Sequence, residues 1–377
     1  MSKAADLANL IGNINAGGGG VNRNLVINGA MNVSQRGDVT GKTSASYGGP
    51  DRFAVGITSH GTYSMSQSST VPSGKGFANS YKLDCTGADT SVGSNAEVTI
   101  QHKIEGQNLQ TLKKGTSEAK PITATFYCRS NLTGTFTLEF FDNDNSRQCS
   151  KNFTISSANT WEFKSITFPA DTTGAFDDDN AQSAVLVWWL AAGNDFTGGT
   201  QNTSAFASNT NANRVSSSIV NMSSSTDNEF LLTGVQLEVG QNPTEFEHEP
   251  FERSLEKCKR YYQRIQAVDS PYQRLATGQC TTNDDISFML QLHPELRAAP
   301  DASTGFDHGT LSNLNVLNSS GGAVAMGSLN FSDFYNGRNT VQITAADVSG
   351  DPLTAGDVSF LHANNNTSAY IAFDAEL

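Results

Sequence analysis

The sequence predicts an all-β protein of two β-sandwich domains joined by one helix, and three observations support this. Segments that alternate apolar and polar residues recur along the chain, separated by clusters of Gly, Asn, Asp and Ser. The 34 glycines and many uncharged polar residues, against 16% charged residues, are typical of β-proteins with many turns. The character of the chain changes after the strand-like segment 230–239, which Gly240, Asn242 and Pro243 end. The length of 377 residues suffices for two domains.

The chain begins with a short amphipathic segment whose apolar residues recur at helical spacing: Leu7, Leu10, Ile11 and Ile14. A helix of this length is marginal alone in water, so it must dock on a partner or on copies of itself. The four glycines at 17–20 then predict a flexible tether. We therefore interpret residues 1–21 as an anchor peptide with a linker; the alternative is a frayed terminus without a function.

Residues 22–249 are predicted to form the first β-sandwich. Strands are expected at 24–37 (with a turn at Asn28–Gly29), 50–56, 80–84, 96–102, 123–129, 135–141, 148–155, 161–168, 184–190 and 230–239. Segment 135–141 alternates cleanly, and the polar residues 142–145 supply a hairpin turn after it. Segment 161–168 changes phase midway, which predicts a bulge.

Three features of this domain carry further expectations. Trp188 and Trp189 are adjacent on an apolar strand, so they must point to opposite faces, and both are expected to be buried. The Ser/Thr/Asn-rich passage 194–228 is long for a loop, so it is either functional or ordered by its neighbours. The closing strand is apolar at odd positions from Leu231 to Val239, which predicts one face on the core and a wet face with Gln236 and Glu238.

A connecting helix is predicted at 250–266, because Pro250 suits a first helical turn and apolar residues follow at helical spacing: Phe251, Leu255, Cys258 and Tyr262. Residues 267–377 are predicted to form a smaller, knob-like C-terminal β-sandwich, with strands at 286–293, 340–345, 358–362 and 369–374. No repeat of fixed period is present, which disfavours a β-helix or a propeller.

Composition excludes several partners. The net charge of -13 leaves no basic surface for a nucleic-acid backbone. No apolar run approaches the roughly 20 residues of a membrane-spanning helix, so membrane insertion is not expected. The five cysteines are widely spaced, which predicts buried free thiols in a protein made in a reducing cytosol rather than a disulfide framework or a zinc site.

The sequence contains no catalytic constellation. The six histidines are scattered, and neither a phosphate-binding glycine loop nor a nucleophile elbow is present. We therefore expect no catalytic residue, no cofactor and no metal, although Asp142 with Asp144, or the acidic run 177–179, has the oxygen ligands that Ca²⁺ prefers. Turn formation explains these acids more simply. A glycosidase needs two carboxylates at a fixed separation, which a sequence does not reveal.

Aromatic residues are the candidates for stacking on sugars. One loop combines Phe334, Tyr335, Asn336 and Arg338, and this mixture of rings and hydrogen-bonding groups suits glycan contact. Trp161, near the start of a predicted strand, is a further candidate. Ordinary packing is the alternative for each of them.

A series of motifs resembles bacteriophage tail fibre and related virion proteins, especially of marine cyanophage type. In order, the motifs are NLVINGAM (24–31), QRG (35–37), DRF (51–53), QHKIEGQNL (101–109), FPADTTG (168–174), LAAG (190–193), TGVQLEVG (233–240), PTEFE (243–247) and CKRYY (258–262). Together they extend over residues 22–264, and the C-terminal domain matches less distinctly. The chain departs from the family at Phe53, where Trp is frequent, and near Val33 and Ser34, where another aromatic residue is common.

The resemblance implies a jelly roll like that of carbohydrate-binding modules as the first domain, in a homotrimeric fibre with a distal knob. It also implies a virion protein, assembled in the host cytoplasm, that binds other phage tail or capsid proteins through its N-terminus and a host cell-surface polysaccharide through its C-terminal domain. It supplies no catalytic residue. Two alternatives remain: a purely structural capsid or tail decoration protein, and a polysaccharide depolymerase.

Overall fold

A computed structural model of the chain describes residues 3–5, 7–8, 11, 22–318, 320–331, 336–348 and 353–377. The chain divides into two compact units, Met1–Leu255 with Leu377, and Glu256–Glu376. In both units the strands pair in antiparallel sheets, which confirms the predicted all-β class. Among the described residues, no helix has the length and hydropathy needed to cross a bilayer.

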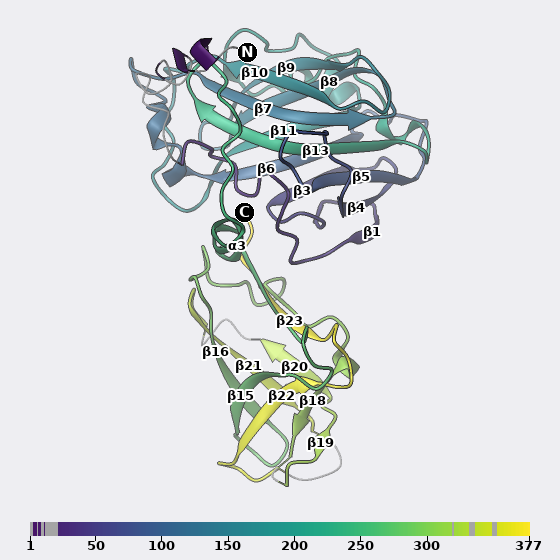
Figure 1. Cartoon of the computed structure of the whole chain (residues 1–377), viewed down its shortest axis with the longest axis vertical. Helices are drawn as coiled ribbons and strands as arrows, with labels where there is room; N and C mark the ends of the chain where they lie inside the picture. Colours follow the sequence, from purple (N-terminus) through teal and green to yellow (C-terminus); the bar gives the residue numbers. More distant parts are fainter. Residues whose placement is uncertain are drawn as a thin grey trace. The chain divides into compact units, whose positions relative to one another are not determined.

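The first unit consists of two stacked sheets, each named here after a central strand. The β13 sheet has the order β1 (Val39–Lys42), β4 (Thr62–Ser68), β5 (Ser80–Gly87), β13 (Glu229–Val239), β7 (Ile122–Ser130) and β10 (Glu162–Phe168). The β11 sheet has the order β12 (Ala207–Ser208), β9 (Arg147–Ile155), β8 (Gly134–Asp142), β11 (Gln182–Ala192), β6 (Glu97–Glu105), β3 (Phe53–Thr58) and β2 (Ser46–Tyr47). Figure 1 shows the β13 sheet with β10 above and β1 below.

The connections between these strands make the sandwich a jelly roll. From β5 to β8 each strand lies in the opposite sheet from its predecessor, and the chain returns through β9, β10, β11 and β13. The resulting orders are β5-β13-β7-β10 and β6-β11-β8-β9, two interleaved Greek keys. The facing sides of the two sheets share one core that includes Phe126, Phe136 and Trp188. The expected jelly roll is therefore confirmed.

Some strand predictions need correction. Residues 24–37 are not a strand, because the chain turns at Asn28 and Met31, where φ is positive, and only single backbone bonds, such as Leu25 N–H to the Leu237 carbonyl (2.9 Å), join it to β13. Strand β10 begins at Glu162 and pairs with β7 without a register shift, so the predicted bulge is absent there. Phe163 simply points outward while Ile166 and Phe168 enter the core.

Strand β13 has the bulge instead. Its register shifts between Thr233 and Gln236, and Gly234 has φ +61°. Phe230 and Leu232 therefore face the core before the bulge, and Val235, Leu237 and Val239 after it. The prediction that Leu231 and Thr233 share the core face was wrong, because a single alternation cannot continue through a bulge.

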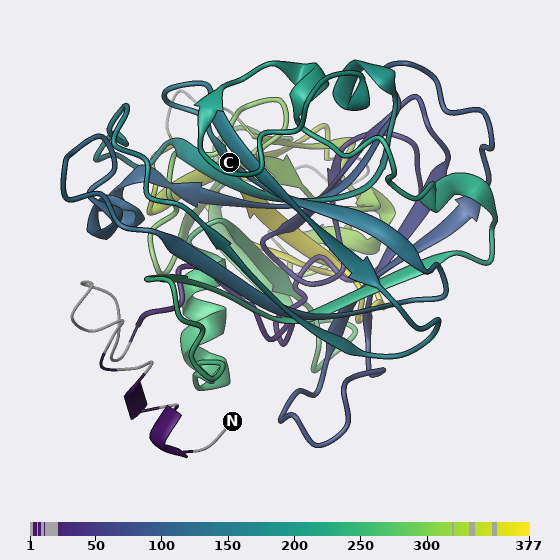
Figure 2. The same cartoon turned by 90° about the horizontal axis from the view of Figure 1, so that it is seen from above.

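Residues 194–228, called the strap below, cover the outer face of the β11 sheet. The strap contains α2 (Asn194–Thr197), η3 (Asn211–Asn213) and η4 (Met222–Ser224) as short helical turns, which lie along one side of the sandwich in Figure 2. Trp189 packs on this face with Val215 and Phe196 of the strap, whereas Trp188 lies in the central core. Both tryptophans are fully buried on opposite faces, as predicted. The strap is thus ordered by its neighbours.

An ion pair fixes the strap to the sheet. The Arg214 guanidinium donates two hydrogen bonds of 2.9 Å to the Glu139 carboxylate, and the Trp189 indole N–H donates a third at 2.8 Å. Glu139 is fully buried. Glu97 is a second carboxylate near this guanidinium; burial raises its pKa, and the charge of Arg214 opposes that shift. The strap is therefore held to the sheet by one half-buried cation, Arg214, whose side chain is 18% exposed.

The predicted connecting helix is shorter than expected. Helix α3 covers Phe251–Lys259, and strand β14 (Tyr262–Gln266) begins three residues later. Tyr262 therefore belongs to a sheet, not to the helix stripe, because residues 262–266 pair with β23 (Tyr370–Asp374). Phe251 is half exposed and Cys258 is buried. All five cysteines are buried free thiols, as predicted.

The second unit is a smaller sandwich. Its three-stranded sheet has the order β14, β23 and β17 (Phe306–Asp307). Its seven-stranded sheet has the order β19 (Ala323–Val324), β18 (Leu314–Leu317), β22 (Val358–Ala363), β15 (Arg274–Cys280), β16 (Ile286–Gln291), β21 (Thr340–Ala346) and β20 (Ser328–Phe331). Phe373 of the small sheet and Phe288 and Ile343 of the large one share a core.

Candidate functional site

Five aromatic side chains form a row on the outer face of the β13 sheet: Phe163, Tyr127, Phe77, Phe246 and His248, called the aromatic row below. Consecutive ring centroids lie 5.1 Å apart from Phe163 to Tyr127, and 5.8 Å apart from Tyr127 to Phe77. The Phe77 ring lies 5.0 Å from Phe246 and 5.2 Å from His248. Successive rings are tilted by 53° and 59° along the first two steps, so the row is stepped rather than flat.

Strand alternation places the first two rings. Phe126 and Cys128 of β7 enter the core, so Tyr127 between them points outward. Phe163 of β10 is its direct cross-strand partner, and this puts the two rings side by side. Phe163 is 47% exposed, and Tyr127 is half-buried. The row therefore starts on an open part of the sheet.

The third ring depends on the bulge of β13. Phe77 comes from the loop between β4 and β5 and lies directly over Gly234, where a Cβ atom would be only 2.6 Å from Phe77 Cζ. Position 234 therefore requires a glycine for two reasons: its φ is positive, and the Phe77 ring approaches its Cα too closely for a side chain. The same bulge that disrupts the alternation of β13 thus makes room for Phe77.

Residues 241–248 supply the far end of the row and are held down by buried polar groups. The Glu238 carboxylate accepts hydrogen bonds from Thr244 N (2.8 Å) and Thr244 Oγ1 (2.7 Å), while Gln236 Oε1 accepts one from Glu247 N (2.7 Å). Glu238 and Gln236 are fully buried, so the expectation that they face water was wrong. Residues 241–248, which include Phe246 and His248, cover Gln236 and Glu238 and exclude water from them.

The row lies in a polar, weakly acidic setting. Burial raises the pKa of Tyr127, and the nearby Glu245 carboxylate raises it further, so the phenol stays neutral and is able to donate a hydrogen bond. Ser165, on the same face of β10 as Phe163, is exposed beside the row. Phe163 and His248 are exposed, Tyr127 and Phe246 are half-buried, and Phe77 is buried between them. The accessible rings, with hydroxyl groups beside them, suit an uncharged, polyhydroxylated ligand, whose apolar faces stack and whose hydroxyls hydrogen-bond.

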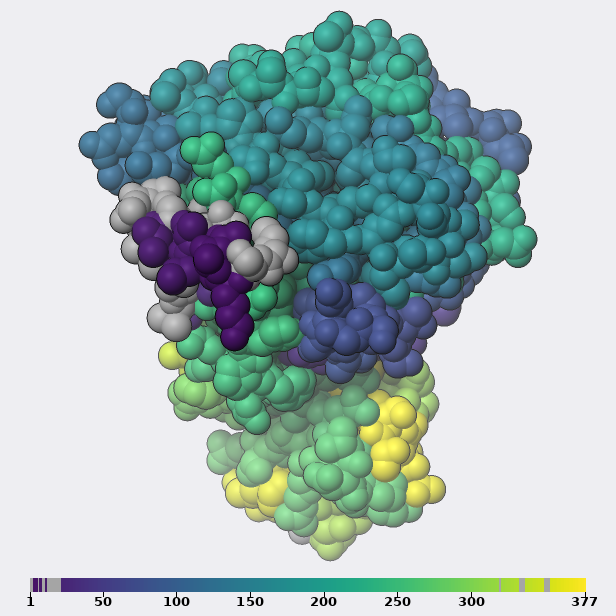
Figure 3. Space-filling model, turned by 45° about the horizontal axis from the view of Figure 1, so that its top comes forward, coloured from purple at the N-terminus to yellow at the C-terminus, as the bar shows by residue number. Residues whose placement is uncertain are grey.

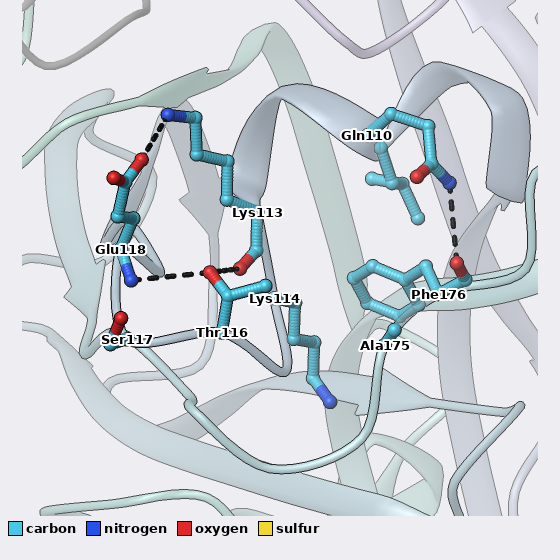
Figure 4. A pocket seen from close by; sticks show the side chains of 9 residues that line it. Gln110, Lys113, Lys114, Thr116, Ser117, Glu118, Ala175 and Phe176 are labelled. Atoms are coloured by element: carbon cyan, nitrogen blue, oxygen red, sulfur yellow. Dashed lines mark hydrogen bonds and ion pairs between the residues drawn. The ribbon is translucent and has the colours of Figure 1, made fainter.

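A second feature is a pocket of about 450 Å³ at one end of the sandwich, called the loop pocket below. Residues 109–118, which include η2 (Gln110–Leu112) and precede β7, form one wall, and Ala175 with Phe176 forms the other. Figure 4 shows Lys113 and Glu118 joined by an ion pair at its rim. The volume is within the range of small-molecule sites.

Lys114, beneath this pocket, occupies a cage of oxygen atoms. Its ammonium pairs with Asp142 (2.5 Å) and Asp171 (3.2 Å), and it donates to the carbonyls of Thr173 (2.8 Å) and Gly174 (2.7 Å). Burial alone would raise the pKa of Asp171, but hydrogen bonds from Arg147 and the charge of Lys114 hold it below its usual range. Asp142, a sequence candidate for Ca²⁺, thus binds a lysine instead.

The other acidic residues considered as metal ligands or paired carboxylates have structural roles in the described part of the chain. No group of three or more His, Cys, Asp or Glu side chains within the described residues has the arrangement of a metal site. Asp144 accepts a hydrogen bond from Asp177 N (3.0 Å), which fits the turn interpretation of these acids. Glu97 and Glu139, two carboxylates that do lie near each other, share Arg214 under the strap.

Of the glycan-contact residues predicted from sequence, the structure describes Trp161 in the first unit and Asn336 and Arg338 in the second. Trp161 is half-buried just before β10, and its indole nitrogen lacks a hydrogen-bond partner among the described residues. Arg338 forms an exposed ion pair with Glu295, and Asn336 accepts a hydrogen bond from Gln342 N. Phe334 and Tyr335 lie outside the described residues. These four residues of the C-terminal loop remain a sequence-based prediction.

The anchor candidates are partly described. Residues 3–5, 7–8 and 11 are helical, and the side chains of Leu7 and Ile11 are 57% and 49% exposed. Figure 3 shows these residues in purple at the surface. Leu10 and Ile14 lie outside the described residues. The role of all four as an anchor therefore stays a prediction.

Sequence reasoning missed the aromatic row entirely. Its five members come from four separate segments, and only the pairing of β10 with β7 and the return of residues 241–248 bring them together. One signal was present: Phe163 is out of phase with Ile166 and Phe168, which marks it as outward-facing on a regular strand. Its partner Tyr127 then follows from the register alone.

Comparisons with known proteins gave structural matches only. No family model matches the sequence, and no curated protein matches it. One similar structure is the enzymatically active domain of tailspike protein 4 from bacteriophage CBA120. The match covers 58% of this chain and 21% of that chain, with 14% identity and a TM-score of 0.30. The chain thus spans about a fifth of that tailspike.

Two sugar-binding structures are matched over nearly their whole length. One is a putative sugar binding protein from Bacteroides thetaiotaomicron, with 14% identity and a TM-score of 0.31 over 57% of this chain and 99% of its own. The other is TmCBM61 in complex with β-1,4-galactotriose, with 9% identity and a TM-score of 0.30 over 58% and 99%. At these identities and TM-scores the similarity concerns the fold alone and does not bear on function.

Proposed function

We propose that this protein is a non-enzymatic phage tail fibre protein that binds a host cell-surface polysaccharide. The observation that carries the proposal is the aromatic row on the outer face of the β13 sheet. Phe163 and Tyr127 present partly exposed rings 5.1 Å apart, and the buried Phe77, 9% exposed, joins them to Phe246 and the exposed His248. A row of this kind stacks on successive sugars of a chain, and its tilted steps suit a twisted glycan better than a flat ribbon. The acidic surroundings, with Glu245 beside Tyr127, favour an uncharged polysaccharide.

The assignment to a virion rests on the ordered motif series and on the exposed apolar residues Leu7 and Ile11 of the N-terminal helix. In this proposal residues 1–21 attach the protein to other tail or capsid proteins. Three copies assemble into the fibre, so that weak single sites act together through their high effective concentration.

Polysaccharide binding is tested by retardation in native gels that contain a soluble neutral polysaccharide, with β-glucan, galactan, mannan and xylan as the panel. We expect at least one of them to retard the protein. A variant with both Phe163→Ala and Tyr127→Ala should bind about tenfold to a hundredfold more weakly. Each ring is already about half covered in the free protein, so a ligand buries roughly the equivalent of one whole ring, which contributes about 1.5–3 kcal/mol. Val92→Ala, which removes another exposed apolar side chain of the same unit, is the matched control.

The same gels separate the alternatives. A protein that no polysaccharide retards, or a double variant as strongly retarded as the wild type, would contradict binding by the aromatic row and favour a purely structural decoration protein. Release of reducing ends from a retarding polysaccharide would instead show a depolymerase.

The assembly is tested by mass photometry of the purified full chain at about micromolar concentration, where obligate oligomers remain associated. We expect a particle of three copies. A monomer under these conditions would argue strongly against a fibre.

A further inference from the structure

We propose that the loop pocket is a second saccharide site, which binds a single neutral sugar ring through two adjacent hydroxyl groups. This inference goes beyond the proposed function, because it concerns a different surface of the jelly roll and a ligand of one ring rather than a chain. It stands on three properties of the pocket: walls fixed before any ligand arrives, an apolar floor, and a rim with one cation and one anion.

The walls are fixed by the groups beneath them. Gly115 has φ +81°, and a Cβ atom there would lie 2.5 Å from Ala175 N, so the two walls meet as closely as two backbones can. Lys114 then ties them together, since it extends from one wall and donates hydrogen bonds to Thr173 and Gly174 of the other. A site that is already ordered loses little conformational entropy on binding.

The floor is apolar and the rim is polar. Leu109 is fully buried and Phe176 is 6% exposed, and both line the pocket from below. At the rim, Glu118 accepts a hydrogen bond from the Lys113 ammonium, and this ammonium holds the pKa of Glu118 below its usual range. A carboxylate beside an ammonium matches a pair of adjacent hydroxyls, which donate to the one and accept from the other.

The charge balance selects a neutral ligand. Lys113 and Glu118 cancel at the rim, and Lys114 is neutralised from below by Asp142 and Asp171. An anionic sugar would be repelled by the Glu118 carboxylate, and a cationic sugar would be repelled by the Lys113 ammonium. Since the side chains of Lys113 and Glu118 are 50% and 67% exposed, their ion pair is weak and is easily opened by a ligand.

The test uses the full chain and neutral methyl hexopyranosides, namely those of glucose, galactose and mannose, with their monodeoxy analogues. Saturation-transfer NMR detects binding, and titration calorimetry gives the dissociation constant. We expect at least one hexopyranoside to bind and its analogue lacking one of the two hydroxyls to bind more weakly. Glu118→Gln and Lys113→Met should each weaken binding by about tenfold to a hundredfold, because each removes a hydrogen bond to a charged group.

Matched controls keep the outcome interpretable. Glu252→Gln in α3 and Lys42→Met at the end of β1 alter other residues of the first unit that have the same charges, and both should leave the affinity unchanged. Phe163→Ala should weaken polysaccharide retardation but leave hexopyranoside binding intact, which separates this site from the aromatic row. The inference is overturned if no hexopyranoside binds, if Glu118→Gln binds as tightly as the wild type, or if Phe163→Ala abolishes the binding.

Discussion

Replacing Lys114 with methionine is expected to lower the free energy of unfolding by about 3–5 kcal/mol, the usual result of removing one partner from a buried ion pair. Methionine retains most of the apolar stem but has no charge. Asp142, which is fully buried, would keep only its hydrogen bonds from Asn145, and the carbonyls of Thr173 and Gly174 would lose their donor. Urea denaturation of the two proteins at neutral pH measures the difference.

Lys113→Met is the control for this experiment. Lys113 is the preceding residue in the chain, but its ion pair with Glu118 is exposed to solvent, so its loss should leave the free energy of unfolding nearly unchanged. If the two variants were equally stable, the oxygen cage around Lys114 would not have the structural role assigned to it.

Replacing Arg214 with methionine should lower the free energy of unfolding by a similar amount, roughly 3–5 kcal/mol near neutral pH. The substitution leaves the Glu139 carboxylate buried beneath the strap with only the Trp189 indole N–H as a hydrogen-bond partner. The strap should loosen at the same time. Denaturation measures the stability, and hydrogen exchange of residues 194–219 measures the loosening.

The deficit of the Arg214 variant should depend on pH. Burial raises the pKa of Glu97 in the folded protein, and the charge of Arg214 limits that rise. A carboxyl group with a raised folded pKa binds its proton more tightly when folded, so the free energy of unfolding increases as the pH falls through that pKa. Without Arg214 the pKa of Glu97 in the folded protein is raised further, so the variant gains more stability than the wild type as the pH falls. The difference in the free energy of unfolding between the two proteins should therefore shrink between about pH 7 and about pH 5. A deficit that stays constant or grows toward acid would contradict this assignment.

The two proposed binding surfaces differ in what holds them in place. The first two members of the aromatic row are positioned by cross-strand pairing, whereas the walls of the loop pocket are positioned by Lys114. Lys114→Met should therefore impair hexopyranoside binding more than polysaccharide retardation. The large loss of stability expected for this variant makes Glu118→Gln and Lys113→Met the cleaner tests of the pocket itself.

The strands with an uninterrupted alternation were predictable, and those that depend on a bulge or on distant contacts were not. Segment 135–141 forms one regular strand, with Phe136, Leu138 and Phe140 in the core, so its period of two predicts both its extent and its facing. Strands β4 and β15 were missed, because Ser, Thr and Gln occupy much of them and the apolar alternation, such as Tyr63 and Met65 in β4, is short. Helix α3 was predicted, but its C-terminal end was not, because Tyr262 pairs with β23 and so belongs to a sheet.

By itself, the sequence determined the all-β class, the outward and inward facing of regular strands, the opposite burial of Trp188 and Trp189 and the free thiols, because each of these depends on local period or composition. Tertiary structure alone decided which side chains became neighbours. The aromatic row needs the register of β10 on β7, the bulge at Gly234 and the return of residues 241–248, and the Lys114 cage joins segments that a jelly roll brings to one end. Such contacts join residues far apart in the chain, so no local pattern encodes them.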